Sequence, residues 1–93
     1  SFYTTKNKEN ELTLIQSLRS NLENDYETDL SETDIDLVIN KFSEFLENNK
    51  SITIESDRKL FIEQKKTELQ NLGKNHLILA LDFVLERSKG KYI

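Results

Sequence analysis

The chain has 93 residues, of which 35% are hydrophobic and 32% are charged, and its formal net charge is −4. This length accommodates one hydrophobic core, and the apolar content is too high for a disordered tail. The absence of cysteine excludes disulfides and thiolate metal sites. No apolar run approaches the roughly 18–20 residues that a membrane-spanning helix needs. We expect one cytoplasmic helical domain over residues 1–93, without cofactor or metal, that forms the C-terminal part of a longer protein.

Acidic and basic residues are unevenly distributed along the sequence. Residues 1–57 contain 5 basic and 13 acidic side chains, whereas residues 58–93 contain 8 basic and 4 acidic ones. The acidic part would repel nucleic acid and attract a basic protein, and the basic part would do the reverse. The alternative interpretation is two solvated helix surfaces that differ only in sign.

Helical spacing of apolar residues dominates the first half of the chain. The first predicted helix covers Lys8 to Glu23, and residues 24–30 form a loop rich in Asn and Asp, which favour turns. Ser31 is the predicted N-cap of a second helix that continues to Asn48. The side chains predicted to face the core are Leu12, Ile15, Leu18 and Leu22 in the first helix, and Ile35, Val38, Ile39, Phe42, Phe45 and Leu46 in the second.

The third predicted helix begins near Thr53 or Ser56, both of which are suitable caps, and ends at Gly73, a residue type favoured just after a helix C-terminus. The segment from Glu63 to Glu68 is wholly polar, so we expect one turn or more to be exposed. The apolar positions of this region are Ile52, Ile54, Leu60, Phe61, Leu69 and Leu72.

The fourth predicted helix follows Asn75 and continues to Ser88, where Gly90 stops it. From Leu77 to Leu85 it is apolar on nearly every side, which is typical of a helix enclosed by other helices. The predicted fold class is therefore all-α: a compact bundle of about four helices with a central apolar C-terminal helix, against which the second helix packs. The predicted core consists of Ile35, Val38, Ile39, Phe42, Leu46, Leu77, Leu81, Val84 and Leu85.

Catalytic chemistry has little support in the sequence. His76 is the only histidine, and with no cysteine and no second imidazole it cannot build a His-based metal site. We interpret it as a residue that caps or packs locally at a helix start. The carboxylate pairs Asp34 and Asp36, and Glu44 and Glu47, are typical of solvated helix surfaces, and there is no glycine-rich phosphate loop. We expect no enzyme, and no catalytic, cofactor-binding or metal-binding residues.

Two segments resemble the DnaD-type C-terminal domain. Residues 24–35, NDYETDLSETDI, are similar to an acidic, aromatic-containing loop that leads through Leu-Ser/Thr-Pro-x-Glu-Ile into an amphipathic helix, although Thr33 stands where proline is usual. Residues 77–93, LILALDFVLERSKGKYI, are similar to the family's Leu-Ile-x-x-Ala-Leu-x-x-Ala-Val helix, basic turn and Tyr-Ile step. The two blocks cover roughly half of the chain in the family's order. An added stretch over residues 49–72 separates them, and the closing motif is cut off at Ile93.

The resemblance implies a non-catalytic adaptor domain of a bacterial, plasmid or phage replication initiator or of a replisome organiser. Such a domain recruits a host replication protein (a primase, helicase, loader or initiator), binds DNA without sequence preference, or does both. The candidate contact residues are Arg87, Lys89, Lys91, Tyr92 and Ile93, together with Lys74. Cations beside an aromatic ring can neutralise phosphates and stack on a base or an apolar surface. The alternative is that this end folds back onto the bundle and caps the fourth helix.

Other functions fit the same size and helix count. Small cysteine-free four-helix bundles also occur as bacteriocin immunity proteins, which act by binding a protein complex, but that likeness is architectural and carries no motif. The uneven third helix would also allow a homodimer. A basic protein partner would instead contact the acidic second helix at Glu44 and Glu47. We expect no membrane partner.

Overall fold

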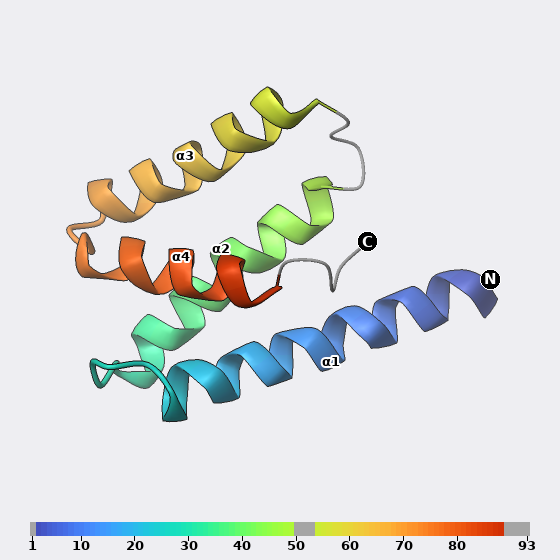
Figure 1. The fold of residues 1–93 in the computed structure, drawn as a ribbon, viewed down its shortest axis with the longest axis horizontal. Coiled ribbons are helices and arrows are strands. Elements are labelled where there is room, and N and C mark those ends of the chain that lie inside the picture. The colour runs from blue at the N-terminus through green and yellow to red at the C-terminus, as the bar shows by residue number, and fades with distance from the viewer. Residues whose placement is uncertain (1, 50–53, 89–93) are drawn as a thin grey trace.

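Four α-helices make up the described part of the chain, and no strand is found there. The structure is a computed structural model that describes the backbone of residues 2–49 and 54–88 and the side chains of residues 10–48 and 54–88. The helices are α1 (Phe2–Asn24), α2 (Glu32–Asn49), α3 (Glu55–Asn71) and α4 (His76–Ser88) (Figure 1). The prediction of an all-α bundle is confirmed. None of the described helices is both long enough and apolar enough to cross a membrane.

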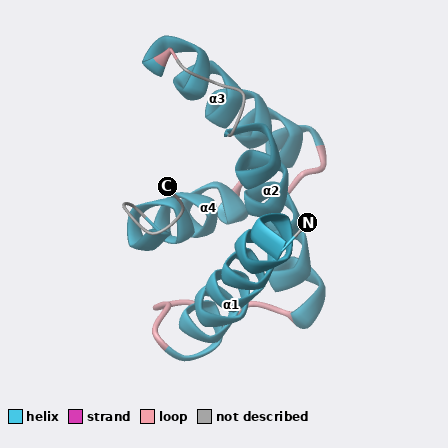
Figure 2. Cartoon of the chain, turned by 90° about the vertical axis from the view of Figure 1, so that its right-hand side faces the viewer, coloured by secondary structure: helices cyan, strands magenta, loops and turns pink. Residues whose placement is uncertain are grey.

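Helices α2 and α4 form the centre of the bundle. Each of them contacts all three other helices, whereas α1 and α3 lie on opposite sides and share no contact among the described residues. Figure 2 shows α1 and α3 spreading away from the central pair. The predicted central position of the C-terminal helix, with the second helix packed against it, is therefore confirmed.

The hydrophobic core draws on all four helices. Every residue of the predicted core is buried except Leu85, which is partly buried and packs against the core. The buried apolar residues are Leu14, Leu18, Leu22, Ile35, Val38, Ile39, Phe42, Phe45, Leu46, Leu69, Leu77, Ala80, Leu81 and Val84. All six apolar positions predicted to face inward from the second helix belong to this core, because spacings of three and four keep them on one helix face.

Helix α1 differs from its prediction in length and in its buried face. It begins at Phe2 instead of Lys8. Leu12 was expected on the apolar stripe of this helix but is 53% exposed, whereas Leu14 is 9% exposed. The buried stripe follows the spacing of four from Leu14 through Leu18 to Leu22, and Leu12 lies about 160° around the helix from Leu14. The sequence alone did not distinguish a stripe that contains Leu12 from one that contains Leu14, because both place leucines at helical intervals.

Helix α3 also starts differently from its prediction. Its N-cap is Ile54, whose side chain makes no capping hydrogen bond, and Ser56 already lies inside the first turn. Thr53, the other predicted cap, lies outside the described residues. Of the predicted apolar positions, Leu69 is fully buried, whereas Leu60 is 67% exposed. Packing of α3 onto the bundle therefore rests on few apolar contacts, and polar side chains complete it.

Candidate protein-binding groove

The turn between α3 and α4 is fixed by backbone hydrogen bonds. Gly73 has a φ of 74°, a left-handed conformation that glycine adopts without steric cost. Its N–H donates to the Gln70 carbonyl at 3.0 Å, and the Lys74 N–H donates to the Leu69 carbonyl at 3.0 Å. These two bonds form the Schellman arrangement that commonly ends helices. The predicted helix end at Gly73 is confirmed, and the turn carries Lys74 and His76 toward the start of α2.

Asp34, in the first turn of α2, contacts the side chains of both Lys74 and His76. The Lys74 Nζ lies 3.1 Å from Asp34 Oδ1, and His76 Nε2 lies 3.3 Å from Asp34 Oδ2. The Asp34 N–H donates to Ser31 Oγ at 3.2 Å, which confirms the predicted N-cap. Hydrogen bonds from His76 and then from Lys74 lower the pKa of Asp34 despite its burial. Lys74 and His76 thus join the start of α4 to α2, although both side chains remain partly exposed.

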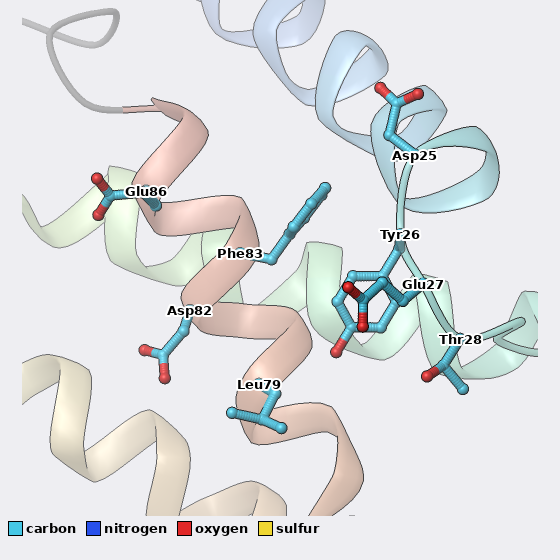
Figure 3. Close-up of a pocket in the computed structure, with 8 residues that line it drawn as sticks. All are labelled: Asp25, Tyr26, Glu27, Thr28, Leu79, Asp82, Phe83 and Glu86. Carbon is cyan, nitrogen blue, oxygen red and sulfur yellow. The ribbon is translucent and has the colours of Figure 1, made fainter.

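An open groove lies between the loop that links α1 to α2 and the outer face of α4 (Figure 3). Its volume is about 620 Å³. The lining residues come from loop residues 25–28 and from two turns of α4, and they are Asp25, Tyr26, Glu27, Thr28, Leu79, Asp82, Phe83 and Glu86. The groove therefore joins two segments that lie about 50 residues apart in the sequence, because one supplies the loop and the other supplies α4.

One wall of the groove is held by aromatic and ionic contacts. The rings of Tyr26 and Phe83 meet edge to face, with centroids 5.1 Å apart and an interplanar angle of 75°. The Arg87 guanidinium lies 4.6 Å from the Phe83 ring centroid, and its Nη1 lies 3.4 Å from Asp25 Oδ2. Burial, and secondly the charge of Glu27, raise the pKa of Tyr26. These contacts tie the loop to α4, so this wall exists before any ligand arrives.

Leu79 forms the floor of the groove and is open to solvent. Its side chain is 68% exposed, although its neighbours Ala80 and Leu81 are 0% and 2% exposed. The expectation that α4 is enclosed on nearly every side is wrong at this face, because the loop reaches Phe83 without covering Leu79. A single exposed leucine is common on a protein surface. Here the leucine adjoins two partly buried aromatic rings in a concave surface.

Carboxylates surround this apolar floor. Four of the eight described lining residues are acidic and none is basic. Asp82 is paired with Lys66 of α3 at 2.8 Å, and Asp25 is paired with Arg87. Glu27 and Glu86 are exposed. Figure 3 shows Asp82 and Glu86 projecting from one side of α4, with Tyr26 and Phe83 on the other. The groove thus combines an apolar floor with a negative rim.

A second polar cluster joins α2 to α3 and includes one predicted contact residue. The Lys65 Nζ lies 3.1 Å from Glu44 and 3.2 Å from Glu68, and the Lys41 Nζ lies 2.7 Å from Glu68. Lys41 and Lys65 are each 13% exposed, so the expected exposed turn of α3 is in part covered by α2. Glu44 and Glu47 are both exposed, and Glu44 also pairs with Lys65 in this cluster.

The protonation behaviour of this second cluster follows from its geometry. Burial disfavours the charged form of Lys65, but hydrogen bonds to Glu44 and Glu68 outweigh it, so the pKa of Lys65 is raised. The hydrogen bond from Lys41 lowers the pKa of Glu68, and that from Lys65 adds to it. In the neighbouring pair, the hydrogen bond to Asp82 raises the pKa of Lys66. The pKa shifts of Lys65, Lys66 and Glu68 all favour their charged forms, and the resulting ion pairs join α3 to α2 and α4.

The predicted contact residues are only partly brought together. Arg87 lies at the edge of the groove, and Lys74 lies at the other end of α4 against Asp34. Lys89, Lys91, Tyr92 and Ile93 lie outside the described residues. Three groove residues, Tyr26, Leu79 and Phe83, were not singled out as contacts, because within an apolar helix and an acidic loop no sequence signal separates a surface position from a core one.

No protein-family model, curated protein or solved structure matches the chain. Among the described residues, no group of three or more His, Cys, Asp or Glu side chains is arranged to hold a metal ion.

Proposed function

We propose that this chain is a non-catalytic adaptor domain that acts by binding another protein. The observation that carries the proposal is the groove beside α4, where Leu79 is 68% exposed between an aromatic wall and exposed carboxylates. A concave surface with an apolar centre and a polar rim has the composition of a protein-binding patch. Ion pairs and an edge-to-face ring contact fix its wall, which reduces the ordering cost of binding.

We further propose that the partner belongs to DNA replication. The resemblance of residues 24–35 and 77–93 to the DnaD-type C-terminal domain supports this, since in that family such a domain recruits a primase, helicase, loader or initiator. Both segments contribute to the groove. Protein binding is favoured over DNA binding at this site, because Arg87 at its edge is already paired with Asp25 and the carboxylate rim would repel phosphates.

A pull-down from a low-GC Gram-positive lysate, treated with nuclease and identified by mass spectrometry, tests this function. The wild-type domain should recover a replication protein independently of nucleic acid, and Leu79→Ala should lose it. Leu60→Ala is the matched control, because Leu60 is equally exposed but lies on α3 outside the groove. Recovery of membrane permease components alone would replace this function with the immunity-type alternative. Loss of all partners on nuclease treatment would replace it with DNA binding.

A further inference from the structure

The geometry points to a cationic amphipathic segment of a partner protein as the ligand of the groove: one large apolar side chain seats on Leu79, Tyr26 and Phe83, and flanking Lys or Arg side chains pair with Glu27 and Glu86. This inference rests on the proposed function insofar as the groove is a protein-binding site, and it adds the chemistry of the partner.

The apolar floor specifies an anchor side chain. Leu79 and Phe83 are four residues apart on α4 and therefore lie on the same helix face, next to the Tyr26 ring. A helix or strand of a partner that inserts one Leu, Phe or Ile here covers Leu79, which no described helix covers. Large apolar anchors in such positions carry much of the energy of protein interfaces.

The rim specifies the charge of the residues around that anchor. Arg87 and Lys66 pair with Asp25 and Asp82, but no described cation lies within ion-pair distance of Glu27. Glu27 on the loop and Glu86 on α4 flank the floor. Lysine or arginine on the partner would pair with Glu27 on one side and with the exposed Glu86 on the other, and such rim pairs chiefly set specificity and association rate.

The size of the groove specifies a short recognition element. From Leu79 to Glu86 the groove follows seven residue steps of α4, a length of roughly 10 Å at the rise of an α-helix. A partner helix that packs along it therefore contributes about two turns, with its anchor and cations three or four residues apart.

Charge separates this ligand from the two other occupants that would fit the space. Nucleic acid brings phosphates toward the carboxylate rim, which is unfavourable. A second copy of this chain carries the same net charge of −4. Five of its described cations, Lys41, Lys65, Lys66, Lys74 and Arg87, are paired with carboxylates of their own fold. A basic segment of a different protein complements both the floor and the rim.

The test uses three synthetic peptides of about 15 residues, the length of a short amphipathic helix. The first carries a Leu and Phe stripe flanked by Lys and Arg. The second replaces its Lys and Arg with Glu, and the third keeps the cations but replaces the stripe with Ser. Binding to the full chain is measured by fluorescence anisotropy at low and high salt, and light scattering reports the oligomeric state in the same buffers.

We expect the first peptide to bind at least about tenfold more tightly than either of the others. Leu79→Ala should weaken it about tenfold, and Leu79→Gln should do the same with the helix retained. The double variant Glu27→Gln/Glu86→Gln should weaken it severalfold and reduce its salt dependence. Leu60→Ala and Glu47→Gln, which alter an exposed leucine and an exposed glutamate outside the groove, should leave the affinity unchanged.

Three results would overturn the inference. Equal binding of the Ser-substituted peptide would show attraction by charge alone. Equal effects of Leu79→Ala and Leu60→Ala would place binding outside the groove. Dimerisation that Leu79→Ala abolishes would assign the groove to a second copy. Failure here and failure of the proposed function remain separable, because a replication protein captured through Leu79 without peptide binding refutes only the ligand chemistry. Peptide binding without such a capture refutes only the replication role.

Discussion

A single carboxylate, Asp34, connects the start of α2 with the turn that precedes α4. Its carboxylate contacts the side chains of Lys74 and His76, while its backbone N–H donates a hydrogen bond to the Oγ of the cap residue Ser31. The only histidine therefore has a structural contact, but with a distant segment of the chain and not only with the start of its own helix, where the sequence suggested local capping or packing. That interpretation did not foresee the partner, because Asp34 is 42 residues away in the chain and only the fold brings them together.

Asp34→Asn should destabilise the fold in a pH-dependent manner. The folded-state pKa of Asp34 lies below its ordinary value of 3.8, so its ion pairs contribute fully above that pH and are lost as the pH falls through the folded-state pKa. The difference in free energy of unfolding between wild type and Asp34→Asn, measured with urea from about pH 7 to about pH 3, should therefore shrink in acid. Asp36→Asn, at an exposed position paired with Arg19, is the control and should cost less.

Leu79→Ala and Leu81→Ala should differ sharply in their effect on stability. Leu81 is 2% exposed within the core, so its truncation should cost about 2–5 kcal/mol. Leu79 is 68% exposed, so its truncation should change the free energy of unfolding by no more than about 0.5 kcal/mol. Thermal or urea unfolding of both variants checks this. A large loss for Leu79→Ala would mean that this leucine serves packing and would remove the argument for an open binding floor.

At the scale of the helices, α3 is the element that the sequence describes least well. Its polar middle predicted an exposed turn, because apolar spacing was the only guide to burial. In the structure Lys65 and Lys66 face α2 and α4 and pair with Glu44 and Asp82. Long side chains can cover apolar surface with their stems while their charged ends find partners. Such partners lie on other helices, so spacing within α3 carries no information about them.

Glu68→Gln should weaken the packing of α3 on α2. Lys41 is 13% exposed and would lose its 2.7 Å partner, so we expect a loss of about 1 kcal/mol after allowance for the partial exposure of Glu68. Because its pKa is lowered from the ordinary 4.5, the contribution of Glu68 should be present above that pH and disappear in acid. Glu63→Gln on the same helix is the control, since Glu63 is 69% exposed and its pair should be worth no more than about 0.5 kcal/mol. Equal losses in urea unfolding of the two variants would contradict this account.

Helices α2 and α4 were largely predictable from sequence, and the reason is their strong apolar signal. In α2, Ile35 through Leu46 repeat at spacings of three and four, and Ser31 marks the start. In α4 the apolar residues are so dense that the pattern indicates burial without indicating which face remains open. The position of the groove depends on how loop residues 25–28 return against α4, and that path is a tertiary feature.

At the scale of the whole molecule, the acidic first part and the basic second part of the sequence form ion pairs with each other within the fold. Carboxylates from the acidic first part pair with cations of the basic second part at Asp25–Arg87, Asp34–Lys74 and Glu44–Lys65. This third possibility was not among the sequence-based interpretations, which considered only solvated surfaces or external partners. The groove beside α4 takes part in this pairing through Asp25 and Asp82, although its own lining contains four carboxylates and no described cation.

The measurement that tests the account most directly is chemical-shift mapping on the uniformly ¹⁵N-labelled chain. The cationic amphipathic peptide is added in steps while backbone amide signals are followed, with Leu79→Ala as the comparison. We predict that the largest changes fall on residues 25–28 and 79–86 and that Leu79→Ala abolishes them. Changes centred on α2 around Glu44 and Glu47, or on α3 around Leu60, with the groove signals unmoved, would contradict the assignment of this groove as the binding site.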